Sequence, residues 1–344
     1  MTTSKVVTLG EVARAAGVSL ATASRALNGS TRRVNADLAQ RVLEAAGQLG
    51  YVPNVHAQAI ARGSSSVVGL VVPDIDDPYF SAIAAGVMTA AERAGLVVTI
   101  GATRRNAERE LTYLGMLRAQ RARAVILVGS RSSDRALTER LAREVAAFES
   151  AGGRVACVSQ PRLGTDTITP ENRAASRELA RALAGLGHTR FAVLSGPGEV
   201  VTGQDRLTGF VGGLADHHLP LPASNVVDGP FTRDGGYHAA KELLSRKVDF
   251  TCVFAVNDVM AVGAMVAFRE AGLAIPGDVS VAGFDDIATL RDISPSLTTV
   301  QLPLASMGEQ ALRMALDAPS ERPRVVRVTG RVVLRESTRT LAAG

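Results

Sequence analysis

From Val67 onward the chain alternates short apolar runs with longer segments of helical periodicity, and this alternation restricts the possible folds most. Apolar runs that indicate strands occur at 67–72, 96–101, 124–129, 154–159, 190–195, 225–228, 251–256 and 279–284. Helical periodicity indicates one helix that ends at Ala94. It indicates further helices at 108–120, 134–150, 172–186, 203–217, 234–244 and 258–270. Such alternation is typical of parallel sheets covered on both faces. Because the repetition is too long for one open sheet, the sequence predicts an α/β protein with two doubly wound lobes.

The two lobes are expected to be connected by several chain crossings. The part of the chain beyond residue 297 contains further strands and a helix, and we expect it to cross back between the lobes as a hinge. Ligands of doubly wound folds bind at the carboxyl ends of the strands, so a cleft between the lobes is the expected binding site. The predicted ranges are 66–171 with 302–328 for the first lobe, and 172–301 with 329–344 for the second.

An all-α head of residues 1–52 is predicted to precede the lobes. The stretch 8–28, TLGEVARAAGVSLATASRALN, contains two apolar helical patterns joined at Gly17, and Ser19 is a suitable N-cap for the second. A sharp joint with a polar outer face is typical of a helix-turn-helix, although an ordinary helical hairpin fits this pattern equally well. The residues predicted to pack between the helices are Leu9, Val12, Ala13, Ala16, Val18, Thr22, Ala23 and Leu27. Those left on the outer face of the second helix are Leu20, Ala21, Ser24 and Arg25.

A third helix and a linker complete this head. Asn35 is a plausible N-cap, apolar residues follow at helical spacing, and Gly50 ends the helix. Residues 53–65 then contain a short helical segment after Pro53 and a Gly-Ser linker. The segment is too short to be a stable helix alone, so it requires a partner, either a second copy of itself or DNA.

Charge is distributed unevenly along the chain. The net charge is +5, and residues 1–63 contribute +4 of it, from seven Lys and Arg against three Asp and Glu. A basic head on a nearly neutral body is typical of a protein whose head binds a polyanion, with a chance cluster of surface arginines as the alternative. No apolar run reaches the roughly 18 residues of a membrane span, and the first residues lack the pattern of a signal peptide. We therefore expect a cytoplasmic protein without a membrane partner.

Several chemistries lack the residues that they need. The 2 cysteines, Cys157 and Cys252, lie in apolar runs and are expected to be buried reduced thiols. The 5 histidines do not combine with them in zinc spacing. SGPG at 195–198 lacks the ending of a phosphate loop, and no GxGxxG follows a strand. No nucleophile, base and orienting acid stand out together. We therefore expect no cofactor and no enzymatic activity.

Polar and aromatic residues follow the predicted strands and are candidates for the cleft. Carboxylates and amides bind paired hydroxyls, arginine donates several hydrogen bonds, and aromatic rings stack on apolar faces, so together they fit a polyhydroxylated small molecule. Each also has a structural alternative: Asp77, Asp258 and Asp286 are expected to cap helices, and Phe80 and Tyr79 fit a core equally well. The candidates are Asp74, Asp77, Tyr79, Phe80, Ser130, Ser159, Gln160, Arg206, Asn257, Asp258, Asp285 and Asp286.

These motifs, in this order, resemble the lactose repressor (LacI) family of bacterial transcription regulators from about Val7 to Thr338. The most specific ones are TLGEVARAAGVSLATASRALNGS, GYVPN, VVGLVVPDIDDPYF, LGHTRFAVLSGP, RLTGF, AVNDVMAVGAM, IPGDVSVAGFDD, PSLTTVQLP and RESTR. The resemblance implies a homodimer, or a higher oligomer, whose heads read the halves of a palindromic operator in double-stranded DNA. It also implies a hinge helix near the linker, with Ile60 inserted into the minor groove. The implied DNA-binding residues are Thr8, Leu20, Ala21, Thr22, Ser24, Arg25, Asn28, Asn54, His56 and Ile60.

The resemblance further implies a small-molecule effector, a sugar or sugar derivative, in the cleft. Glu171-Asn172 replaces the usual Asp-Asn, and Ser159-Gln160 stand where a carboxylate is frequent, so the ligand is expected to differ from a common hexose. The predicted function is a DNA-binding repressor controlled by this effector. The alternative is a stand-alone sugar-binding or sugar-converting protein. The implied effector-binding residues are Asp74, Tyr79, Phe80, Ser130, Arg206, Asn257 and Asp285.

Overall fold

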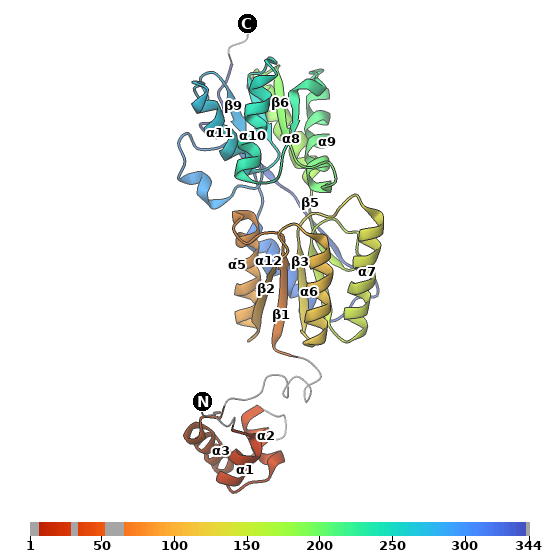
Figure 1. Cartoon of the computed structure of the whole chain (residues 1–344), viewed down its shortest axis with the longest axis vertical. Helices are drawn as coiled ribbons and strands as arrows, with labels where there is room; N and C mark the ends of the chain where they lie inside the picture. The colour runs from red at the N-terminus through yellow and green to blue at the C-terminus, as the bar shows by residue number, and fades with distance from the viewer. Residues whose placement is uncertain (1–6, 29–33, 52–64, 342–344) are drawn as a thin grey trace, which may run out of the picture. The chain divides into compact units, whose positions relative to one another are not determined.

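The computed structural model describes residues 7–28, 34–51 and 65–341 (Figure 1). The chain divides after Ser66 into two units, and three short helices form the first. As predicted, the Ser19 hydroxyl accepts a hydrogen bond from the Thr22 amide at 3.1 Å, and Gly17 has a φ of +62° between the first two helices. A small core of Val12, Ala13, Ala16, Ala23, Val42, Ala45 and Ala46 joins all three. The helices are α1 (Leu9–Ala15), α2 (Leu20–Asn28) and α3 (Ala36–Leu49).

The body begins with a sheet of parallel strands in the order β11-β5-β4-β3-β1-β2. Successive residues of each strand point to opposite faces, so both faces are apolar and both are covered. Helices α5 (Pro78–Arg93) and α12 (Leu304–Leu316) pack on one face, and α6 (Ala107–Ala119) and α7 (Arg135–Ser150) cover the other. The strands are β1 (Val67–Val72), β2 (Val97–Ala102), β3 (Ala124–Val128), β4 (Arg154–Val158), β5 (Asp166–Pro170) and β11 (Val325–Val328).

The second lobe has a smaller parallel sheet in the order β7-β6-β8-β9. Helices α8 (Asn172–Gly185) and α9 (Val201–Ala215) pack together, as do α10 (Arg233–Ser245) and α11 (Asp258–Glu270). Short 3-10 helices occur at Ala223–Asn225 and Ala288–Arg291. The strands are β6 (Phe191–Ser195), β7 (Val226–Asp228), β8 (Cys252–Ala255) and β9 (Ser280–Ala282).

The chain crosses between the lobes three times. It passes from β5 to α8, then from β10 (Thr299–Gln301) to α12, and finally from β11 to β12 (Arg331–Val333). Strands β10 and β12 pair antiparallel at the crossing. The Ser337 hydroxyl then donates to the Val281 carbonyl at 2.6 Å, which ties the C-terminal segment to the second lobe.

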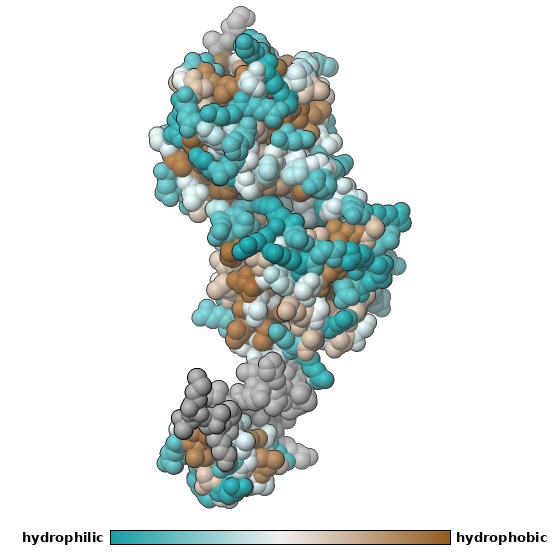
Figure 2. Space-filling model, in the orientation of Figure 1, coloured by the Kyte–Doolittle hydropathy of each residue, from teal (hydrophilic) through white to brown (hydrophobic). Residues whose placement is uncertain are grey.

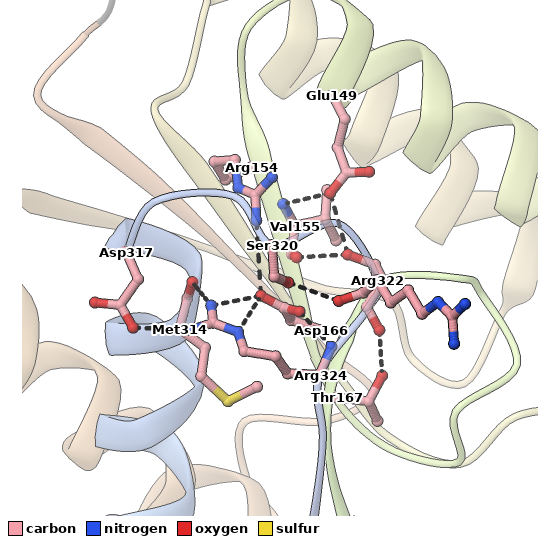
Figure 3. Close-up of polar contacts among 11 residues, drawn as sticks. Glu149, Arg154, Val155, Asp166, Thr167, Met314, Asp317, Ser320, Arg322 and Arg324 are labelled. Carbon is pink, nitrogen blue, oxygen red and sulfur yellow. Dashed lines mark hydrogen bonds and ion pairs between the residues drawn. The ribbon is translucent and has the colours of Figure 1, made fainter.

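Strand β5 was not predicted, because its sequence, DTITP, has a single large apolar residue. Tertiary contacts pair its buried carboxylate instead (Figure 3). The Asp166 carboxylate, only 3% exposed, accepts hydrogen bonds from the Arg324 backbone amide at 2.7 Å and from its Nη2 at 2.6 Å. Arg154 approaches the same carboxylate at 3.6 Å. This ion pair holds the returning strand β11 beside β5.

Replacing Asp166 by asparagine is expected to destabilise the body by about 1.5–3 kcal/mol, because charge-assisted hydrogen bonds to Arg324 are lost. Urea unfolding measures the change. The matched control is Asp317→Asn, since Asp317 also pairs with Arg324, at 3.0 Å, but its side chain is 53% exposed. That variant is expected to change stability by about 0–1 kcal/mol. Equal losses in the two variants would show that burial of Asp166 contributes nothing.

The two thiols are buried and free, as expected. Burial raises the pKa of Cys157 to about 12, so this thiol is neutral at physiological pH. Within the described ranges, no helix combines the length and the apolar character required to span a membrane.

Candidate functional site: a recognition helix and a cleft between the lobes

The outer face of α2 carries side chains predicted to read DNA. Leu20 is 57% exposed, Ala21 and Arg25 are also exposed, and Ser24 is half-buried. Thr22 is half-buried too, and its hydroxyl forms a 2.8 Å hydrogen bond with the N-cap serine. A short helix with an accessible outer face fits the shape of a helix that enters the major groove.

Thr8, predicted as a phosphate contact, is the N-cap of α1. The Glu11 amide donates to its hydroxyl, and the Thr8 amide donates to the Glu11 carboxylate at 2.8 Å, which forms a capping box. Asn28 is the last residue of α2. The side chain of Asn28, together with Asn54, His56 and Ile60, lies outside the described residues.

A cleft of about 480 Å³ lies between the two lobes of the body. Its walls are the carboxyl ends of the strands and the first turns of the helices that follow them, as a doubly wound fold predicts. Six of the seven predicted effector-binding residues line it: Tyr79, Phe80, Ser130, Arg206, Asn257 and Asp285.

The seventh, Asp74, is not among the lining residues, and Asp77 lines the cleft instead. The Asp74 carboxylate accepts a hydrogen bond from the Asp76 amide at 3.1 Å and so stabilises the turn after β1. Asp77 caps α5, since its carboxylate accepts from the Tyr79 amide at 3.0 Å, and this cap directs the side chain to the cleft. Burial raises the pKa of Asp77 above its usual value. The carboxylate that lines the cleft is therefore the one that caps the helix after β1, and not the one nearer to the strand.

Arg206 forms the polar centre of the cleft and is only 3% exposed. Its Nε donates to Asn172 Oδ1 at 2.9 Å, its Nη1 to the Val256 carbonyl at 2.7 Å, and its Nη2 to Asp285 Oδ1 at 2.7 Å. The guanidinium also stacks over the Phe284 ring, 3.8 Å from its centroid. The arginine thereby joins α8, α9 and the loop after β9 around one point.

Asp285 links this centre to the chain crossing. Its φ is +121°, and its amide donates to the carbonyl of Val300 in β10 at 2.8 Å. Burial raises the pKa of the Asp285 carboxyl, and Arg206 opposes that rise because it stabilises the ionised form. A ligand that contacts Arg206 or Asp285 therefore acts beside a strand that connects the lobes.

The other cleft candidates have structural roles. Asn257, not Asp258, caps α11, and its Oδ1 accepts from the Met260 amide at 3.0 Å. Asp258 is buried and accepts from the Thr299 hydroxyl and the Ile287 amide. Asp286 caps no helix, and it accepts from Arg335 and Gln301 at 2.6 and 2.7 Å. The capping role expected from the sequence is thus confirmed for Asp77 and wrong for Asp258 and Asp286.

Two arginines that the sequence pattern did not single out also line the cleft. Arg131, 4% exposed, pairs with Glu110 of α6 at 3.0 Å. Arg105 lies between the rings of Phe80 and Phe231, 5.8 and 5.9 Å from their centroids, and donates to the Phe231 carbonyl at 2.9 Å. Both arginines follow strand ends, as Ser130 does. Their position after a strand could have identified them as cleft residues from the sequence.

Hydrogen bonds close one side of the cleft directly from lobe to lobe. The Thr202 amide donates to the Ser130 hydroxyl at 2.9 Å, and Gln160 Nε2 donates to the Thr202 hydroxyl at 2.9 Å. Ser132 and Val200 form an antiparallel bridge beside them. The residues at 159–160 that depart from the family pattern are therefore part of this cleft. A two-lobed body with a polar cleft, together with a helix-turn-helix head, defines a DNA-binding protein regulated by a small ligand.

Comparisons with known proteins agree with this class. The model of bacterial regulatory proteins of the lacI family matches residues 8–54, and that of a periplasmic binding protein-like domain matches 180–338. The transcriptional regulator GalS of Salmonella typhimurium is 36% identical over 313 residues, 90% of this chain and 89% of GalS. The lac repressor dimer bound to operator and the anti-inducer ONPF superposes with a TM-score of 0.81 at 26% identity, covering 97% and 100% of the two chains. The complex of the regulator CelR with cellobiose gives 0.71 at 28% identity, with 96% and 99% covered.

The chain belongs to the LacI family of bacterial regulatory proteins. It is a DNA-binding transcriptional regulator and not an enzyme, because relatives that match nearly its full length are HTH-type regulators. The alternative of a stand-alone sugar-binding or sugar-converting protein has no support among these relatives.

Proposed function

We propose that this regulator is a repressor that binds a palindromic operator as a homodimer and releases or tightens it when a carbohydrate binds in the cleft. The observation that carries the proposal is the Arg206–Asp285 pair, which lies in the cleft and is bonded to a crossing strand. A ligand shifts an equilibrium only by its different affinity for the two states. A ligand held between the lobes has different affinities for the open and closed states when lobe closure changes its contacts.

The lining of the cleft supports a carbohydrate. The residues that line the cleft include the aromatic Tyr79, Phe80 and Phe231 and the amides Asn172 and Asn257. Rings stack on the apolar face of a sugar, while amides and carboxylates bind its hydroxyls. The similar regulator CelR forms a complex with cellobiose, which is consistent with this class of ligand.

An exposed apolar surface supports a homodimer. Ile75, Met88, Val97 and Ile100 are 41%, 51%, 64% and 40% exposed, and Figure 2 shows hydrophobic side chains over α5 and β2. Strand β2 is the edge of its sheet. An open edge flanked by large apolar side chains is suited to cover by a second protein surface. The lac repressor, which has the same fold, binds operator as a dimer.

For DNA recognition we propose that Leu20 and Ala21 occupy base-reading positions, where they contact a thymine methyl or pack against sugar, while Ser24, Arg25 and Asn28 provide polar contacts. Thr8 and Thr22 are proposed to lie near phosphates. His56 is also proposed to lie near a phosphate. Ile60 is proposed to enter the minor groove, and Asn54 is proposed to contact DNA. Since the target is chromosomal DNA, we infer that the protein acts in the cytoplasm.

The test is binding to DNA from upstream of the gene for this protein, titrated with salt. A steep salt dependence and an affinity at least about 1,000-fold above random DNA would support an operator-binding regulator. The same titration with added carbohydrates then identifies any that shifts operator affinity. Equal affinity for random DNA would refute the operator, and no shift with any carbohydrate would refute the effector class.

Leu20→Ser is expected to change which operator sequence is preferred, with a loss of at least about tenfold on the natural site. Stability should change by no more than about 0.5 kcal/mol, because the side chain is exposed. Selection from a randomised operator library and thermal melting measure the two effects. Leu43→Ser is the matched control, since Leu43 on α3 is 51% exposed. If both variants, or neither, altered the preferred sequence, Leu20 would not be a base-reading residue.

A further inference from the structure

The positive charges that line the cleft are all paired with carboxylates. Every lining arginine has a carboxylate beside it: Arg105 with Asp77 at 3.4 Å, Arg131 with Glu110 at 3.0 Å, and Arg206 with Asp285 at 2.7 Å. Glu199 lines the cleft as well, so the described lining holds one more carboxylate than guanidinium groups. The cleft therefore offers an anion no excess of positive charge.

Each of the three side-chain nitrogens of the two buried arginines already has a partner within the protein. Arg131 donates through Nε to the Ser159 hydroxyl at 2.9 Å and through Nη2 to the Gly129 carbonyl at 3.3 Å, besides its pair with Glu110. Arg206 uses its three nitrogens on Asn172, Val256 and Asp285. Arginine recognises phosphate or carboxylate with two parallel N–H groups. An anion that takes the N–H groups pointing at Glu110 or Asp285 would displace that residue and leave a buried carboxylate without its partner.

Uncharged groups, by contrast, remain available. Asn172, Asn257 and Tyr79 line the cleft. Both asparagines use Oδ1 as an acceptor, and their Nδ2 groups and the Tyr79 hydroxyl have no hydrogen-bond partner among the described residues. The same holds for Asp285 Oδ2, since Arg206 contacts the other oxygen. Amide donors beside an acceptor oxygen match hydroxyl groups, each of which accepts one hydrogen bond and donates another.

We propose that the cleft selects an uncharged polyhydroxylated ligand and rejects its phosphorylated or carboxylated counterparts. The inference rests on the proposed function only in taking the cleft as the effector site. Selectivity arises because Glu110, Asp77 and Asp285 already neutralise the arginines that would otherwise bind an anion.

The first experiment measures anion binding by the full chain, using sulfate as the probe at ionic strength matched with chloride. Thermal unfolding of the wild type is expected to show no saturable stabilisation. Glu110→Gln frees Arg131 and is expected to bind sulfate at least tenfold more tightly than the wild type. Glu108→Gln is the matched control, because Glu108 lies on the same helix but pairs with Arg140, outside the cleft, at 2.6 Å. It should behave as the wild type does.

Asp77→Asn provides a second route if Glu110→Gln fails to fold, since it frees Arg105, whose side chain is one-third exposed. It too should gain sulfate binding. Saturable sulfate binding by the wild type that Arg131→Gln abolishes would overturn the proposal. So would the absence of any gain in the folded variants.

The second experiment adds matched ligand pairs to the operator complex: glucose with glucose 6-phosphate, galactose with galacturonate, and ribose with ribose 5-phosphate. Whenever a pair changes operator affinity, the neutral member is expected to be the active one. An active phosphate or uronate would overturn the proposal. If no member of any pair acts and the sulfate results hold, these carbohydrates fail as effectors while the charge selectivity stands.

Discussion

Replacing Arg206 by alanine is expected to abolish the response of operator binding to the effector and to destabilise the body by about 3–5 kcal/mol. The second effect follows because Asp285 would keep its burial and lose the charge that compensates it. Asn172 and the Val256 carbonyl would lose a donor in the same change. Urea unfolding measures the stability, and operator binding with and without ligand measures the response.

The double variant Arg206→Ala/Asp285→Ala separates the two effects. Without the buried carboxylate, it should regain part of the stability that the single variant loses, since the two groups form one coupled pair. The effector response should stay absent, because Arg206 is still missing from the cleft. A response that recovered together with stability would mean that Arg206 only holds the fold, and the assignment of the effector site would then fail.

A chain that lacks residues 1–63 is expected to lose operator binding, by about 1,000-fold or more, and to keep its affinity for the ligand. The head and the body are separate compact units, and the buried cores of the two share no residue. The body without the head should therefore unfold cooperatively, with the same stability as the body of the full chain. Gel-shift assays and ligand-induced thermal stabilisation measure the two activities. Loss of ligand binding together with DNA binding would contradict the modular arrangement.

Much of the fold follows from local signals in the sequence. Apolar runs located most strands, because a parallel strand is buried on both faces. Caps located the helix ends of the head, since Ser19, Asn35 and Gly50 act within their own turns. Strand β5 could not be found in this way. Its buried Asp166 pairs with Arg324, a partner distant in sequence.

The cleft was predictable as a place and less so as a set of residues. Strand ends located Arg206 and Asp285, but local backbone geometry decides between neighbouring carboxylates. Asp285 and Asp286 both have positive φ values, +121° and +59°, and one side chain enters the cleft while the other meets Arg335. The Arg131–Glu110 pair joins two elements with no common sequence signal. Such pairing depends on tertiary packing rather than on spacing.

Because the chain returns to the first lobe after the second, the order of synthesis determines when each lobe can be completed. The second sheet is made from residues 191–282, but the first needs α12 and β11, which end at Leu316 and Val328. At about 5–20 residues per second, roughly 10–30 s separate β5 from its partner β11 on the ribosome. During that interval the edge of β5 and the face of α5 that α12 later covers are open to water. The first lobe is therefore the part of this regulator whose apolar surface stays exposed longest during synthesis, and the head can fold before either lobe is complete.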